Sequence, residues 1–117
     1  MGRKGGDGVF LSGYRLMWML VMFDLPVNTP QAQREATRFR QFLLDRGFEM
    51  NQFSVYMRFC GGQKTFEAHV KAIEQNLPSG GDVQILQITD KQYERIRVYS
   101  GQTRRQARKN PNQLALF

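Results

Sequence analysis

Hydrophobic residues follow two different spacings along the chain, and the changes of spacing predict the order of its elements. Residues 16–23 form an uninterrupted apolar run, which is typical of a central strand buried on both faces. Thr29 and Pro30 then open a predicted helix as its N-cap and first residue, and Gly47 ends it. The predicted buried stripe of this helix consists of Ala32, Ala36, Phe39 and Leu43, widened by Phe42.

Two further strands are predicted at residues 48–50 and 53–60, with a short hairpin turn at residues 51–52. Alternation divides the longer strand into two faces. One predicted face is apolar, with Phe53, Val55, Met57 and Phe59, and the other carries Ser54, Tyr56, Arg58 and Cys60.

The second half of the chain repeats the change from helix to strand. A helix is predicted over residues 64–77, followed by a strand over residues 82–89. Asp90 is expected to cap a short turn before a strand-like segment at residues 96–99. The apolar stripe expected on the helix is Phe66, Val70, Ile73 and Leu77.

The order β-α-β-β-α-β predicts an α+β, ferredoxin-like fold over residues 16–99, with two helices on one face of a four-stranded antiparallel sheet. Glycine-rich residues 1–15 are expected to be a flexible lead-in, and residues 100–117 a basic C-terminal extension. Because the first strand is apolar on both sides, its second face needs a cover. A second copy of the sheet is the simplest cover, which predicts a two-fold homodimer.

Charge is concentrated at the two ends of this 117-residue chain, whose formal net charge is +7. Residues 1–15 carry three basic and one acidic side chain, residues 16–96 nine of each, and residues 97–117 five basic ones without an acid. A neutral body with basic ends favours contact with a polyanion such as a nucleic acid, and a solvated tail that aids solubility is the less favoured alternative. Cys60, the single cysteine, indicates a reducing compartment, so we expect a cytoplasmic protein.

Asp24 is the acidic residue that stands out, because it follows the apolar first strand directly. An Asx turn is one interpretation. The other is a metal site, in which two copies of Asp24 share one Mg²⁺ across a two-fold axis, since this ion keeps several waters and needs few protein ligands. The ion would activate a water and stabilise charge on a phosphodiester, which makes Asp24 the candidate catalytic residue.

Four segments together resemble one known family. Residues 21–26 (VMFDLP), 38–48 (RFRQFLLDRGF), 52–58 (QFSVYMR) and 83–93 (VQILQITDKQY) are similar, in order and spacing, to the CRISPR-associated spacer-acquisition proteins of the Cas2 family. The VapD-type toxin nucleases are more distantly similar. These segments are spread over most of residues 16–99.

The resemblance implies a ferredoxin-like homodimer that bridges two dimers of the CRISPR integrase and holds double-stranded prespacer DNA. It also implies metal-dependent endonuclease activity, with Asp24 at the position of the metal ligand. A VapD-like toxin endoribonuclease is the alternative that shares the fold.

Several basic side chains are candidates for contact with phosphates. Arg34 and Arg38 lie four residues apart on the outer face of the first helix, although Arg38 can instead pair with Glu35 or Asp45. The other candidates are Arg15, Arg58, Arg104, Arg105, Arg108 and Lys109. Base stacking is a lesser expectation for Tyr14, Tyr56 and Tyr99, because strand aromatics are more often core residues.

Three remaining features have simpler interpretations. His69 is expected at the surface or at the core boundary, and Cys60 as a small packing residue. The terminal residues 113–117 (QLALF) are expected to form an edge strand that crosses to the partner protomer. They also resemble the peptides by which bacterial proteins bind the replication sliding clamp, with Leu114, Leu116 and Phe117 as the docking side chains.

Overall fold

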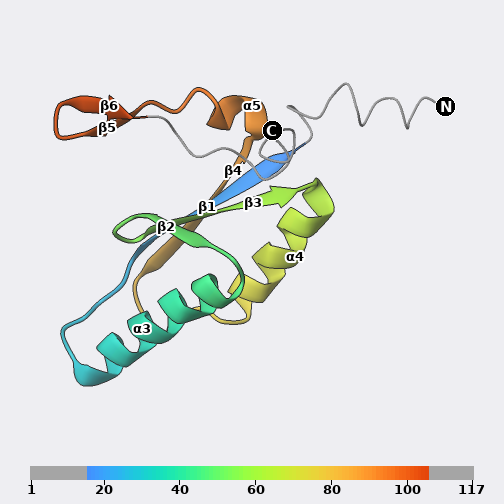
Figure 1. The fold of residues 1–117 in the computed structure, drawn as a ribbon. Helices are drawn as coiled ribbons and strands as arrows, with labels where there is room; N and C mark the ends of the chain where they lie inside the picture. The colour runs from blue at the N-terminus through green and yellow to red at the C-terminus, as the bar shows by residue number, and fades with distance from the viewer. Residues whose placement is uncertain (1–15, 106–117) are drawn as a thin grey trace.

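The computed structural model describes residues 16–105 of the chain. Their elements are β1 (Met17–Asp24), α3 (Pro30–Asp45), β2 (Glu49–Gln52), β3 (Val55–Gly61), α4 (Gln63–Glu74), β4 (Asp82–Thr89), α5 (Asp90–Tyr93), β5 (Val98–Ser100) and β6 (Thr103–Arg105). The main sheet has the order β2-β3-β1-β4 with antiparallel neighbours. Helices α3 and α4 lie on one face of it, as Figure 1 shows. The predicted α+β class and four-stranded sheet are confirmed, and the topology is compatible with a ferredoxin-like arrangement.

The ends of α3 are set by the residues that the sequence indicates. Thr29 caps the helix, because its Oγ1 accepts a hydrogen bond from the backbone N–H of Ala32 at 3.0 Å, and Pro30 follows at the first position. Gly47 adopts φ 86° just after the helix, a conformation that costs glycine little.

Among the helices of residues 16–105, none has the length and apolar character of a membrane span.

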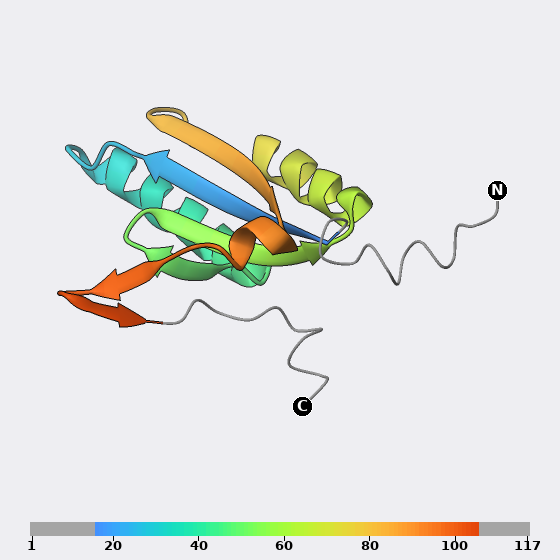
Figure 2. The same cartoon turned by 90° about the horizontal axis from the view of Figure 1, so that it is seen from above.

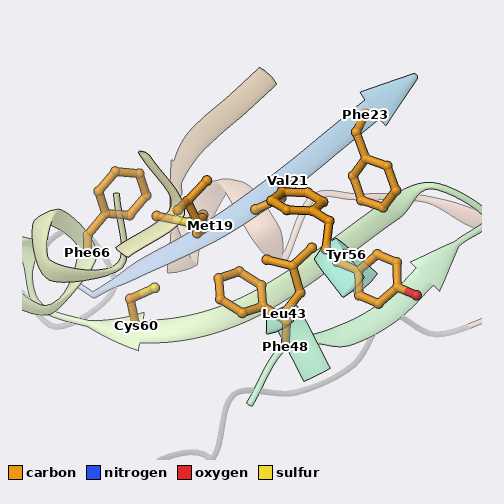
Figure 3. Packing of buried hydrophobic residues seen from close by; sticks show 10 residues of the cluster. Met19, Val21, Phe23, Leu43, Phe48, Tyr56, Cys60 and Phe66 are labelled. Carbon is orange, nitrogen blue, oxygen red and sulfur yellow. The ribbon is translucent and has the colours of Figure 1, made fainter. Parts of the chain in front are cut away.

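The main core lies between the sheet and the two long helices. Met19, Val21 and Phe23 point from β1 into this layer, where they meet Leu43 of α3 and residues of α4 (Figure 3). The rings of Phe23 and Phe39 meet edge to face, with centroids 5.3 Å apart. Cys60 is buried in the same cluster, as expected of a packing residue. This burial raises the pKa of its thiol to about 11.

The opposite face of β1 is covered at one end by a small aromatic cluster. Trp18 stacks on Tyr93 with centroids 3.9 Å apart, and its Nε1 donates a 2.7 Å hydrogen bond to the buried carboxylate of Asp90. The prediction that Asp90 caps the following turn is therefore wrong. Thr89 is the N-cap of α5, in a reciprocal pair of hydrogen bonds with Gln92.

Other boundaries differ from the predicted ones. The hairpin turn is at Phe53 and Ser54 rather than at residues 51–52, because β2 extends to Gln52. Helix α4 ends at Glu74, which leaves Leu77 half exposed beyond it. The strand expected at residues 96–99 is β5, which pairs with β6 in a separate hairpin instead of joining the main sheet (Figure 2).

The predicted polar face of the third strand is also wrong, because this face packs on the helices. Tyr56 and Cys60 are both buried in the main core. Arg58, between them, donates from Nε to the backbone oxygen of Arg46 at 2.8 Å and from Nη1 to that of Phe59 at 2.7 Å. The guanidinium of Arg58 is accommodated because backbone carbonyls at the end of α3 and on its own strand accept its hydrogen bonds.

His69 is buried rather than at the surface. Its side chain is 6% exposed, packs edge to face on Phe48, and accepts a 3.1 Å hydrogen bond at Nδ1 from Nε of Arg46. Burial lowers the pKa of His69 to about 4, and the charges of Arg58 and Arg46 add to the effect. The imidazole is therefore neutral at physiological pH.

We predict that this histidine makes the protein less stable in mild acid. Because its pKa falls from 6.5 to about 4 on folding, its contribution is complete above pH 6.5 and is lost as the pH falls towards 4. Urea unfolding of the wild type and of His69→Gln, which does not titrate there, measures it. The free energy of unfolding of the wild type should fall more steeply between pH 7 and 5. Parallel curves would contradict the prediction.

Candidate functional site

Asp24 is the last residue of β1 and lies directly across the sheet from Asp82, the first residue of β4. Both are exposed, and both lie at alternate positions in register with the residues that face away from α3 and α4. They border a shallow depression of about 420 Å³ that Phe53 and Val55 of the neighbouring hairpin also line. The structure thus places two carboxylates at one edge of the open sheet face.

The backbone that carries Asp24 lies against Gly81. A β-carbon at Gly81 would be 2.4 Å from the backbone oxygen of Asp24 and 2.9 Å from Cδ of Pro26. Gly81 also has φ 82°, in the region that favours glycine. Glycine is therefore required here for the end of β1 to approach the segment that leads into β4.

A carboxylate of α3 holds that same segment from the other side. Glu35 Oε1 accepts hydrogen bonds from the backbone N–H and from the hydroxyl of Ser79, each at 2.8 Å. The backbone hydrogen bond is the largest cause that lowers the pKa of Glu35, and the Ser79 hydroxyl is the next. The loop before Asp82 is thus tied to a helix on one side and to the end of β1 on the other.

The carboxylate oxygens at this edge of the sheet supply some of the ligands that a hard divalent cation needs. Mg²⁺ binds oxygen ligands and is often held by one or two carboxylates, with water completing its shell. Asp24 and Asp82 supply such oxygens, but no group of three or more potential ligands (His, Cys, Asp or Glu) occurs within residues 16–105. Asp82 was not among the sequence candidates, although strand order alone places the end of the first strand beside the start of the fourth.

The predicted nucleic-acid residues fall into three groups. Arg34 and Arg38 are exposed on α3, and no ion pair joins Arg38 to Glu35 or Asp45, which bond instead to Ser79, Gln31 and Gln41. Arg104 and Arg105 are exposed on β6. Arg58, by contrast, is turned into the fold and bonded to backbone carbonyls. The nucleic-acid candidates Arg15, Arg108 and Lys109 lie outside the described residues, and so do the predicted docking side chains Leu114, Leu116 and Phe117.

The aromatic candidates separate by burial. Tyr56 is 4% exposed and belongs to the core, so it has no face for a base. Tyr99 of β5 is exposed, and Tyr14 lies outside the described residues. Phe53, which was predicted as a strand residue, is instead the most exposed of the large apolar side chains in residues 16–105.

We predict that Gly81→Ala destabilises the protein, whereas Gly80→Ala does not. The first substitution combines positive φ with a clash against backbone, which should lower the free energy of unfolding by about 1–3 kcal/mol. At Gly80 the nearest atom to an added β-carbon is Cγ of Pro26 at 3.5 Å, an ordinary contact, so we expect a change within about 0.5 kcal/mol. Urea unfolding of both variants is the measurement, and equal midpoints would contradict the prediction.

Comparison with known proteins identifies the family. A family model described as CRISPR associated protein Cas2 matches residues 17–96. A protein of Paracidovorax avenae named CRISPR-associated endoribonuclease Cas2 is 55% identical over 107 residues, which cover 92% of this chain and 99% of that protein. Proteins of the same name from Parvibaculum lavamentivorans and Flavobacterium psychrophilum are 46% and 43% identical over 101 and 107 residues. Those matches cover 86% and 92% of this chain and 100% and 93% of the relatives. The chain therefore belongs to the CRISPR-associated Cas2 family.

Proposed function

We propose that this chain is a homodimeric subunit of CRISPR adaptation, which binds double-stranded prespacer DNA and bridges dimers of the integrase. The observation that carries the proposal is the apolar face of the main sheet opposite α3 and α4. Apart from the end that Trp18 and α5 cover, this face contains partly exposed apolar side chains of three adjacent strands. They are Met22, Val55 and Leu86, and they adjoin Leu20 and Ile88, which pack against the Trp18 cluster.

A second copy of the sheet is the partner that best suits this face. The apolar side chains lie on the central strand and on both of its neighbours, so they form a continuous surface rather than scattered positions. A two-fold interface presents the same surface from both protomers, which satisfies both copies at once. Such a dimer would place two copies of the Asp24 edge in one particle.

Duplex DNA is supported as a ligand by the position of the arginines. Arg34 and Arg38 are exposed on α3, and Arg104 and Arg105 are exposed on β6. These two elements lie on opposite sides of the main sheet (Figure 1). Guanidinium groups bind phosphate with paired hydrogen bonds, and these contacts do not depend on the base sequence of the DNA. Dimerisation would double the number of these groups along one duplex. The integrase as partner rests on family membership.

Metal-dependent endonuclease activity is a second candidate function. It is favoured by the exposed Asp24 carboxylate at the end of a buried strand, and by relatives whose names describe an endoribonuclease. Asp24 would hold Mg²⁺, shared with the partner's copy, and Asp82 lies close enough in register to orient waters around it. When bound, the ion would lower the pKa of a water and stabilise negative charge on the phosphodiester.

We predict that Leu86→Glu dissociates the dimer and weakens its binding to duplex DNA. A carboxylate on the open face has no partner in a two-fold interface, and its desolvation is costly. Leu44→Glu on α3 is the control, because Leu44 is 45% exposed and Leu86 44%. Light scattering should show the mass of a single chain, and fluorescence anisotropy a weaker affinity for duplex DNA, for Leu86→Glu but not for Leu44→Glu. A Leu86→Glu protein with wild-type mass and DNA affinity would refute the proposed interface.

We further predict that Asp24→Ala abolishes metal-dependent cleavage but preserves the dimer and duplex binding. The substitution removes the proposed ligand without altering the apolar face or the arginines. Asp45→Ala is the control, since Asp45 is an exposed carboxylate at the end of α3 that bonds only to Gln41. Cleavage is assayed over a range of pH with and without Mg²⁺. Equal cleavage by Asp24→Ala and the wild type would exclude Asp24 as the metal ligand.

A further inference from the structure

Phe53 is presented to solvent in an unusual way. Its side chain is 80% exposed, and it occupies the two-residue turn between β2 and β3, where small polar residues are more common. Ser54, the second turn residue, has φ 68°, the one positive value among the non-glycine residues described. An exposed aromatic ring on a backbone that carries strain suggests a role other than packing.

The turn is held in a defined position next to the candidate metal site. The backbone N–H of Phe23 donates a 3.0 Å hydrogen bond to the backbone oxygen of Ser54. Phe23 immediately precedes Asp24, so this bond ties the turn to the end of β1. The backbone of the turn that carries Phe53 is therefore held beside the end of β1 rather than in a free loop.

Arg40 of α3 supports the ring from one side. Its Cζ lies 5.5 Å from the centroid of the Phe53 ring and 6.0 Å from that of Phe23. At these distances a guanidinium group is attracted to the face of an aromatic ring. The contact orients the Phe53 ring and places a positive charge beside it.

An aromatic ring that can stack on a base and a carboxylate that can hold a metal ion line one depression, and the Arg40 guanidinium lies against the ring outside that lining. Phe53 and Asp24 both line the depression of about 420 Å³, with Asp82 on its far strand. A ring of this kind can stack on a base, while Arg40 compensates the charge of a phosphate. No other ring lines that depression except Phe23, whose side chain is buried in the core.

We propose that Phe53 is a stacking platform for one unpaired nucleobase of an RNA strand whose phosphate lies at Asp24. The inference rests on the second candidate function, phosphodiester cleavage at Asp24. The base must be unpaired, because within a duplex both of its faces are covered by neighbouring bases. Since every base has a π-face, the platform fixes the position of the strand without selecting its sequence.

The test uses full-length protein carrying Asp24→Ala, so that the strand is bound without being cut. The probe is a single-stranded RNA with one 2-aminopurine, whose fluorescence is quenched when the base stacks on an aromatic ring. The parent should bind and quench the probe. Adding Phe53→Ala should remove the quenching and weaken binding by about tenfold, within the range for loss of one stacked base. Phe53→Trp should retain both.

Three controls separate stacking from other roles of this residue. Phe53→Leu keeps an apolar side chain without a π-face and should behave as Phe53→Ala. Leu44→Ala and Tyr99→Ala remove exposed apolar side chains elsewhere and should leave the quenching unchanged. Light scattering should give every variant the mass of its parent.

The proposal would be overturned if the parent did not quench the 2-aminopurine fluorescence, or if Phe53→Leu still quenched it. It would also be overturned if Tyr99→Ala lost the quenching, or if light scattering gave Phe53→Ala a different mass from its parent. The last result would make Phe53 a contact between protomers. Failure of the nuclease function and failure of the stacking proposal have different readouts. The first is an absence of cleavage by the wild type. The second is an absence of quenching in the Asp24→Ala protein, which cannot cleave.

Discussion

Strand β1 must be shielded from water on both faces, and the rest of the structure is arranged around that requirement. Helices α3 and α4 shield the face that carries Met19, Val21 and Phe23. On the other face, residues 16–105 shield the end where Trp18 stacks on Tyr93 and bonds to Asp90. The rest of this face carries partly exposed apolar side chains, and since burial of apolar area is the main favourable term in association, this surface is the basis of the proposed dimer.

The parts of the fold that the sequence predicts well are those that depend on local chemistry. The apolar run of β1 and the Thr29 cap of α3 need only neighbouring residues to specify them. The burial of polar side chains is not evident from the sequence, because their hydrogen-bond partners are far away along the chain. His69 lies three residues after Phe66, at core spacing, but its acceptor role depends on Arg46, 23 residues away along the chain.

The candidate site shows the same division. Asp24 was found because it directly follows an apolar strand, whereas Asp82 was missed because only the pairing of β1 with β4 brings it opposite. The alternation of Phe53 with Val55 predicts a strand at Phe53, because alternation does not reveal a turn of two residues. Arg58 illustrates the converse case, since a charged residue predicted for the surface can fold inward when backbone carbonyls accept its hydrogen bonds.

In the proposed pairing of open sheet faces, one interface would serve both stability and catalysis. It would bury the exposed side of β1 and bring two copies of Asp24 together. Sedimentation equilibrium of the unaltered chain over a dilution series through the micromolar range tests this most directly. The account predicts a species with twice the 13.6 kDa mass of the chain. A mass of one chain at every concentration, with or without nucleic acid, would contradict it.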